Sequence, residues 1–154
     1  MYAIINAAAR VYEGVIPADR WHDPYMPEEE LQQEIAAGIV FWGDEEGGEL
    51  IGVMGLQRAQ DVYLIRHAYV RPEWQGHGVG GRLLAHLRAQ ADLPTLVGTW
   101  AAATWAVRFY ENHSYRLVSP EWKDYLLLKY WAIPARQVET SVVLTDSAWF
   151  DLQE

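Results

Sequence analysis

Hydrophobic residues along the chain follow two spacings, one typical of helices and one typical of strands. In the first part, apolar residues recur at helical intervals over 2–12, without Gly or Pro, which predicts a helix that ends at Gly14. Pro27 and the three glutamates after it are typical of a helix start, so a second helix is expected over 27–37, followed by Gly38. The chain therefore begins with a pair of helices.

Short apolar runs bounded by turn residues predict strands in the middle of the chain. Residues 39–42 and 49–57 flank the turn-forming sequence GDEEGG, which predicts a β-hairpin. The next strand is expected over 61–70, with side chains alternating between its two faces. One face carries four side chains: Tyr63, Ile65, His67 and Tyr69. Because the interior of a sheet is apolar, Arg66 and His67 must be paired or functional there.

Helical and strand patterns alternate in the rest of the chain. A third helix is expected from Val79 to about Asp92. The later elements are expected in this order: a strand over 95–100, a helix over 104–112, a strand over 114–118, a helix that starts at Pro120, and a strand over 137–145. This order predicts an α+β, three-layer fold with a mixed, largely antiparallel sheet and helices on both faces. No change of composition marks a boundary, so one domain is expected over 1–154.

Composition argues against several classes of protein. Hydrophobic residues make up 51% of the 154 residues, and eight residues are Trp, which favours a folded globular protein. The absence of Cys excludes disulfides, thiolate metal sites and a cysteine nucleophile. The net charge of −9 disfavours nucleic-acid binding and slightly favours a cationic substrate. No apolar run approaches the length of about 18 residues that a membrane span needs, and no secretory signal is visible, so a cytoplasmic protein is expected.

The glycine-rich segment before the third helix is the strongest candidate for a binding site. It contains four glycines: Gly76, Gly78, Gly80 and Gly81. Glycines let backbone N–H groups approach a ligand closely, and a helix start attracts anions. The G-x-G-x-x-G pattern of dinucleotide folds is present, but the acidic residue that would bind the ribose after the next strand is missing. A P-loop is excluded because the segment has no Gly-Lys-Ser/Thr.

Two further matches give the segment a more specific meaning. Residues 75–80 (QGHGVG) fit the pattern Q/R-x-x-G-x-G/A, and residues 70–72 (VRP) resemble the V-x-P element that precedes it. Residues 106–115 (AVRFYENHSY) look like A-x-x-F-Y-E-x-x-G-F. Over about 25–130, the chain thus resembles the GNAT N-acetyltransferase superfamily, in particular its bacterial-type, single-domain members.

The resemblance implies acetyl-CoA as co-substrate and no metal. In the family, the pyrophosphate lies on N–H groups at the helix start, and the pantetheine arm runs between two strands, here 62–70 and 95–100. The residues expected to bind the co-substrate are Ala68, Tyr69, Val70, Gln75, Gly76, His77, Gly78, Val79, Gly80, Gly81 and Arg82. For Arg82, a solvated helix position is an equal alternative. The chain departs from the family at Ala103, where Asn is frequent, and at Ser114, where Gly is usual.

Acetyl transfer from a thioester to an amine needs a proton donor for the departing thiolate and a proton acceptor for the ammonium group. The resemblance places Tyr110 as the donor, and the alternative is a tyrosine packed in the core. His67 is the candidate acceptor because it lies in the strand that leads to the glycines, although a structural histidine is at least an equal alternative. The backbone N–H of Val70 is expected to bind the carbonyl oxygen.

The sequence therefore predicts an acetyl-CoA-dependent N-acetyltransferase in which a primary amine attacks directly in a ternary complex. The acceptor, a small-molecule or protein amine, is left open; in this family the loop over 14–26 borders it. Two alternatives stand beside this reading: a non-catalytic acyl-CoA-binding module, and a dinucleotide-binding oxidoreductase. Apolar residues over 120–145 would suit a homodimer.

Overall fold

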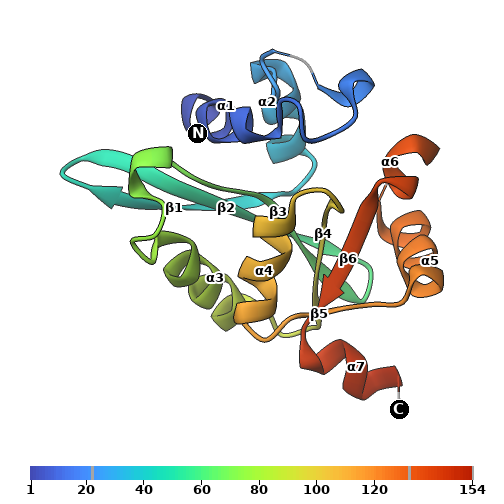
Figure 1. Ribbon diagram of the computed structural model, residues 1–154. Coiled ribbons are helices and arrows are strands. Elements are labelled where there is room, and N and C mark those ends of the chain that lie inside the picture. The colour runs from blue at the N-terminus through green and yellow to red at the C-terminus, as the bar shows by residue number, and fades with distance from the viewer. Residues whose placement is uncertain (22, 132, 154) are drawn as a thin grey trace. The chain divides into compact units, whose positions relative to one another are not determined.

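The computed structural model describes residues 1–21, 23–131 and 133–153, and within these ranges the chain forms two compact units (Figure 1). The first unit comprises Met1–Arg58 and Ile65–Asp92, and the second comprises Ala59–Leu64 and Leu93–Glu154. The described strands form a sheet in the order β1-β2-β3-β4-β6-β5, and β3 (Val62–Val70) has residues in both units. The predicted α+β class with a mixed sheet is confirmed. One domain over 1–154 stays a prediction.

The first unit contains the N-terminal helices, the hairpin and the helix after the glycines. Its elements are α1 (Tyr2–Ala9), the 3₁₀ helices η1 (Arg10–Tyr12) and η2 (Ala18–Arg20), α2 (Glu28–Ala36), β1 (Val40–Glu46), most of β2 (Glu49–Ala59), most of β3, η3 (Pro72–Trp74) and α3 (Val79–Gln90). The hairpin turn is shorter than predicted. Gly47 and Gly48 form it with φ of 59° and 82°, and Glu46 pairs with Glu49. The strands therefore extend further than the sequence pattern suggests.

Helices cover both faces of β2 within the first unit (Figure 1). Val53 belongs to a buried cluster with Ile5 of α1 and Leu31 of α2. The preceding Gly52 faces the other way, because a Cβ built on it would lie 2.6 Å from the side chain of Val79 in α3. Successive strand residues point to opposite faces. The helices α1 and α2 therefore pack on one face of β2, and α3 packs on the other.

The second unit contains β4 (Thr95–Trp100), α4 (Thr104–Asn112), β5 (Arg116–Leu117), α5 (Pro120–Tyr130), α6 (Ala135–Glu139), β6 (Ser141–Thr145) and α7 (Ser147–Gln153). The Tyr63 N–H donates to the carbonyl of Pro94 (2.9 Å), so β3 and β4 begin side by side and run in parallel. The strand β6 pairs antiparallel with both β4 and β5. The bounds of β4 and α4 are those predicted, and α7 was not predicted.

The strand predicted over 137–145 is wrong in its first half, where the chain forms α6. Pro134 supplies the extended residue before this helix, and the Thr140 hydroxyl donates to the carbonyl of Arg136 (2.9 Å) at its end. Apolar alternation over so few residues fits one helical turn as well as a strand, which explains the error. The strand predicted over 114–118 is also too long, because only Arg116–Leu117 pair in the sheet.

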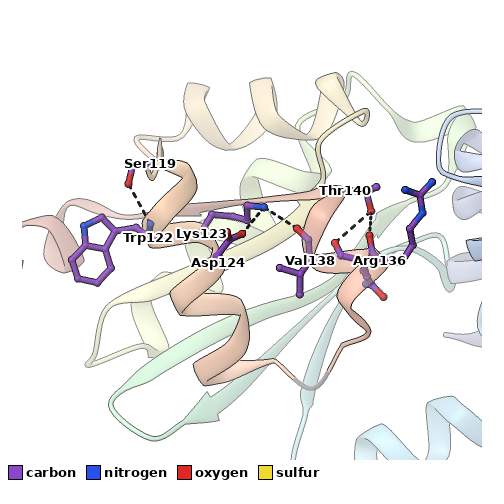
Figure 2. A network of polar contacts seen from close by, with 8 residues as sticks. Ser119, Trp122, Lys123, Asp124, Arg136, Val138 and Thr140 are labelled. Carbon is purple, nitrogen blue, oxygen red and sulfur yellow. Dashed lines mark hydrogen bonds and ion pairs between the residues drawn. The ribbon is translucent and has the colours of Figure 1, made fainter.

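Figure 2 shows how α5 is joined to α6 in the second unit. The Ser119 hydroxyl caps α5 by accepting the backbone N–H of Trp122 (3.3 Å). One residue later, the Lys123 ammonium donates to the carbonyl of Val138 (2.9 Å) and pairs with Asp124 (2.8 Å). The Val138 carbonyl lies in the last turn of α6 and also accepts the backbone N–H of Thr140, the C-cap. Lys123 therefore stabilises the end of α6 from the neighbouring helix.

A polar network in the second unit, defined by Thr95, Tyr115 and Asp146, is buried. One carboxylate oxygen of Asp146 accepts the N–H (3.1 Å) and the hydroxyl (2.9 Å) of Thr95, and the other accepts the N–H of Trp149 (3.2 Å) at the start of α7. The Thr95 oxygen lies 2.5 Å from the Tyr115 oxygen. Because Thr95 has given its one hydroxyl proton to Asp146, Tyr115 is the donor to Thr95. The network thus connects β4, α7 and the segment before β5.

The second unit also has an apolar core. It is formed by Val62, Leu64, Leu96, Leu126, Leu127, Val143 and Trp149. No helix within the described ranges is both long enough and apolar enough to cross a membrane.

Candidate active site

The glycine-rich segment joins β3 to α3 in the first unit. After η3, Gly76 and Gly78 adopt φ of 80° and 79°. This left-handed region is costly for residues with a Cβ, so the turn requires Gly at both positions. Gly78 is the N-cap of α3, and Gly80 and Gly81 lie in its first turn. Two glycines therefore form the turn, and two keep the helix start free of side chains.

The turn presents its backbone to solvent. Residues 75–78 are exposed, and a Cβ built on Gly76 would have no atom within 4 Å. Val79, by contrast, is buried and packs close to Gly52 of β2, which fixes the start of α3 against the sheet. The first N–H groups of a helix have no carbonyl partner within it and carry partial positive charge. A start of this kind suits a diphosphate group such as that of acetyl-CoA.

Two polar side chains of the segment contact backbone carbonyls close to them in the chain. The Gln75 amide donates to the carbonyl of Val70 at the end of β3 (3.3 Å). Nδ1 of His77 lies 3.1 Å from the carbonyl of Gln75, and the His77 ring packs edge-on against Trp74 with centroids 5.5 Å apart. These contacts hold the turn in shape. Ligand contacts by Gln75 and His77 stay predictions.

Arg82 lies one turn into α3 and is held by two partners. Its guanidinium donates to the carboxylate of Asp44 in β1 (2.9 Å) and to the carbonyl of His77 (3.2 Å). The side chain is 58% exposed, so the alternative of a solvated helix position stays open. The side chain also ties the helix to the hairpin and to the turn, and a phosphate contact stays a prediction.

The end of β3 leads directly into the turn. The residues Ala68, Tyr69 and Val70 are half-buried there, and the next N–H, that of Arg71, donates to the carbonyl of Ile51 (2.8 Å). The Arg71 side chain adds a second bond to β2 through the carbonyl of Leu50 (2.7 Å). The strand end is thus fixed to β2, and the pairing of residues 68–70 with pantetheine stays a prediction.

His67 lies in a cluster of charged side chains at the middle of β3. It has φ of 54°, and its ring stacks on Phe41 of β1 with centroids 6.1 Å apart. Its Nε2 contacts one carboxylate oxygen of Glu34 in α2. Arg66 lies 3.4 Å from the other oxygen of Glu34 and donates to the side chain of Gln57 (2.9 Å). The regular alternation predicted for 61–70 therefore does not describe the backbone at His67.

The charge of Glu34 depends on this cluster. Its partial burial raises the pKa of the carboxyl, but the hydrogen bond from His67 and the positive charges of His67 and Arg66 outweigh it, so the pKa lies below the ordinary value. Sequence analysis identified Arg66 and His67 as polar residues that need partners but did not find Glu34. The signal was available, since Glu34 lies three residues after the buried Leu31 on the same face of α2.

Tyr110 lies in the second unit, near the end of α4. It is buried, and its ring packs edge-on against Phe109 and Tyr115, with centroids 5.0 Å and 5.7 Å away. The carbonyl of Tyr110 accepts the N–H of Tyr115 (3.0 Å) after the chain turns at Ser114, whose φ is 72°. The turn and His67 thus belong to the first unit, and Tyr110 belongs to the second. Its role as proton donor stays a prediction.

The chain matches a known protein family. A family model described as the acetyltransferase (GNAT) domain matches residues 6–126, a span that includes the second half of α1, the glycine-rich segment and Tyr110. The chain belongs to the GNAT acetyltransferase family. The resemblance inferred from the sequence motifs is therefore confirmed.

Individual GNAT proteins are similar to this chain to different extents. Aminoglycoside N(6')-acetyltransferase type 1 of Stenotrophomonas maltophilia is 36% identical over 80 residues, which cover 45% of this chain and 52% of that protein. The match thus spans about half the length of that relative. PaiA N-acetyltransferase from Thermoplasma acidophilum, solved with coenzyme A, has a TM-score of 0.68 at 15% identity and covers 93% of this chain and 87% of that one.

A GNAT acetyltransferase from Elizabethkingia anophelis, solved with acetyl-CoA bound, has a TM-score of 0.59 at 21% identity, covering 78% of this chain and 83% of that one. These structures show that the chain has the GNAT fold. Among the described residues, no group of three or more acidic or histidine side chains lies close enough together to hold a metal ion. A homodimer through 120–145 stays a prediction.

Two positions of the chain, Ala103 and Ser114, depart from the GNAT pattern. Ala103 is buried at the N-cap of α4, where the family often has Asn. Ser114 takes the left-handed conformation that the family's usual Gly would favour. The turn after α4 thus has a left-handed serine in this chain.

Proposed function

We propose that this protein transfers the acetyl group of acetyl-CoA to a primary amine by direct attack in a ternary complex. The observation that carries the proposal is the exposed turn at the start of α3, in which Gly76 and Gly78 are left-handed and the first helical turn bears two more glycines. Such a helix start binds phosphate groups through backbone N–H groups. Membership of the GNAT family selects acetyl-CoA among the ligands that carry a diphosphate.

Different residues of the first unit would bind different parts of the co-substrate. In the proposal, the N–H groups of residues 75–81 bind the diphosphate, and the backbone of Ala68, Tyr69 and Val70 pairs with the amides of pantetheine as an added strand would. The Val70 N–H binds the thioester oxygen and stabilises the negative charge that develops there. Arg82 reaches a phosphate by exchanging its bond to Asp44 for the anion.

The chemistry needs three proton transfers. The acceptor first loses a proton as ammonium, because only the neutral amine has a lone pair for attack on the thioester carbon. The C–N bond then forms and the C–S bond breaks. Tyr110 protonates the thiolate, and the proton that the nitrogen loses on forming the amide restores the Tyr110 hydroxyl. A tyrosine suits this role because its ordinary pKa of about 10 lies above the value of about 8.5 for a thiol.

The acceptor class we infer is a small cationic amine. The chain has a net charge of −9, which favours the approach of cations. The relative with 36% identity is named for its action on aminoglycosides, which carry several amines. Aminoglycosides are therefore the first members of an amine panel to test, with polyamines, amino acids and peptides beside them.

Gly80→Val tests the diphosphate site at a position inside α3, where no left-handed backbone is required. Calorimetric titration should show CoA binding to the unaltered protein and at least about tenfold weaker binding to the variant, because the added side chain covers the helix start. Ala85→Val, at an exposed position of the same helix, is the matched control. Equal CoA affinity in all three proteins would contradict the site, and NAD binding without CoA binding would favour an oxidoreductase.

Tyr110→Phe tests the proton donor. Loss of the hydroxyl should lower the rate of thiol release from acetyl-CoA by about 10²-fold or more, while the Kd for acetyl-CoA stays the same. The ring is retained, so its packing against Phe109 and Tyr115 persists. A large loss of affinity or of thermal stability would instead indicate a structural tyrosine. An unaltered protein that binds CoA but releases no thiol with any amine would be a binding module.

A further inference from the structure

The Glu34 cluster is formed by Glu34, Gln57, Arg66 and His67. Only His67, the candidate proton acceptor, has a role in the chemistry predicted from the sequence. The cluster places a carboxylate, a guanidinium and an imidazole together in partly buried positions, with exposed side-chain fractions of 20%, 26% and 15%. Charged groups taken from water are retained only when they are paired. Glu34 forms ion-pair contacts with Arg66 and His67, and Arg66 donates to Gln57, all within the first unit, so the cluster is a built feature of this unit.

The backbone conformation of His67 shows that its surroundings fix the direction of its side chain. A φ of 54° is disfavoured for a residue with a Cβ, and such conformations persist only where the surroundings hold them. Here Phe41 of β1 stacks on the ring and Glu34 of α2 contacts its Nε2. A regular strand would keep His67 on the face shared by alternate residues. The left-handed residue instead brings the imidazole to α2.

The contact with Glu34 assigns the two ring nitrogens different states. A carboxylate accepts a proton-bearing nitrogen, so Nε2 carries the hydrogen when the imidazole is neutral. Nδ1 then has the free lone pair and is the atom able to take a proton. The second oxygen of Glu34 faces Arg66, which in turn donates to Gln57. This arrangement prevents the carboxylate from rotating away from His67.

We propose that Glu34 is a positioning residue that holds His67 as the proton acceptor for the ammonium group of the acceptor substrate. The inference rests on the proposed function. The ammonium of the acceptor gives one proton to Nδ1 of His67, directly or through one water, and becomes the neutral amine that attacks. His67 becomes imidazolium, with Glu34 opposite its Nε2–H, and returns the proton to solvent after the product leaves.

Among the described residues, the Glu34 carboxylate of α2 and the apolar ring of Phe41 of β1 contact the His67 ring. The Arg66 guanidinium of β3 pairs with the same carboxylate and donates to Gln57 of β2. With neutral His67 the charges of Glu34 and Arg66 balance. Protonation gives the cluster one positive charge, and the carboxylate beside Nε2 is the group that stabilises it.

Glu34→Gln tests the inference, with Glu30→Gln, an exposed residue of the same helix, as matched control. Nitrogen-15 NMR of the imidazole should show the Nε2–H form of His67 in the unaltered protein and in Glu30→Gln, and loss of this preference in Glu34→Gln. With acetyl-CoA and an active amine, Glu34→Gln should lower kcat about tenfold. It should leave KM for acetyl-CoA unchanged.

If Glu34→Gln keeps the Nε2–H form of His67 and the kcat of Glu30→Gln, the inference is overturned while the acetyltransferase stands. Absence of amine-dependent thiol release from the unaltered protein would overturn the proposed function, and the inference with it. If Glu34→Gln fails to fold, Glu34→Asp provides the measurement, because it keeps the charge and shortens the reach. It should then give an intermediate loss of kcat with the Nε2–H preference weakened, and full wild-type behaviour would count against the role.

Discussion

Each unit of the molecule contains a carboxylate with polar partners. The two carboxylates differ in whether these partners belong to the backbone or to side chains. In the second unit, Asp146 accepts two backbone N–H groups and the Thr95 hydroxyl, and Tyr115 completes the chain of donors. In the first unit, the Glu34 carboxylate contacts the side chains of His67 and Arg66. The first network is therefore part of the backbone framework, and the second joins side chains to one another.

Exposure separates the two arrangements further. Asp146, Thr95 and Tyr115 are 7%, 2% and 2% exposed, whereas the side chains of His67, Glu34 and Arg66 are 15%, 20% and 26% exposed. A fully enclosed network of fixed donors resists change, because any loss leaves a buried group without a partner. A partly exposed cluster allows proton exchange with a substrate or with water. In the proposed mechanism, similar chemical groups therefore serve folding in one unit and proton transfer in the other.

The largest stability effect is expected for Asp146→Ala. The change removes the cap of α7 and leaves the N–H and hydroxyl of Thr95 buried without their acceptor. We expect the free energy of unfolding to fall by about 2–4 kcal/mol, measured by urea denaturation. Asp151→Ala, on the exposed side of α7, should change it by less than about 0.5 kcal/mol. Equal effects of the two substitutions would remove the distinction between framework and reactive carboxylates.

A smaller effect is expected at alkaline pH from Tyr12, which lies near the start of the first unit. Burial, with the nearby Tyr25 as a second cause, raises the pKa of Tyr12 to about 12. The unfolded chain ionises this hydroxyl near its ordinary value of 10.0, so its contribution to stability is complete below that pH and is lost as the pH rises toward about 12.

Tyr12→Phe should remove this loss. Between about pH 10 and 12 the unaltered protein should lose about 1–2 kcal/mol more of its unfolding free energy than the variant. Tyr2→Phe, a partly exposed tyrosine of α1, serves as control and should behave as the unaltered protein does. Identical alkaline stability curves for Tyr12→Phe and the unaltered protein would show that Tyr12 ionises as freely in the folded state as in the unfolded one.

The smallest effect is expected from Glu34 at acidic pH. Its pKa is lowered in the folded state, because the hydrogen bond from His67 and the charges of His67 and Arg66 outweigh burial. Its contribution to stability is therefore complete above the ordinary value of 4.5 and is lost as the pH falls through the lowered pKa. The unfolding free energy of Glu34→Gln should thus fall less steeply below about pH 4.5 than that of Glu30→Gln.

Much of the fold could be predicted from local patterns. The helix over 104–112 and the strand over 95–100 were predicted with their observed bounds, because apolar spacing and flanking turn residues both indicate them. The segment over 137–145 failed because its few alternating apolar residues fit one helical turn equally well. Pro134 before it was the better indicator of α6.

The glycine turn could be predicted because its features lie within a few residues of each other. Which glycines are left-handed could not, since G-x-G-x-G-G offers several ways to turn, and the structure selects Gly76 and Gly78. The partners of the carboxylates were also beyond the sequence. Thr95 and Asp146 are 51 residues apart, and Arg66 and Glu34 are 32 apart. Such pairs form only when the sheet has brought their elements together.

The most direct test of the proposed function is thiol release from acetyl-CoA in the presence of a panel of amines that includes aminoglycosides. We expect release that depends on the amine, forms one acetylated amine for each thiol, and falls with Gly80→Val and with Tyr110→Phe but not with Ala85→Val. Binding of CoA without thiol release from any amine would contradict acetyl transfer and leave a binding module. Failure to bind CoA would contradict the role of the glycine turn itself.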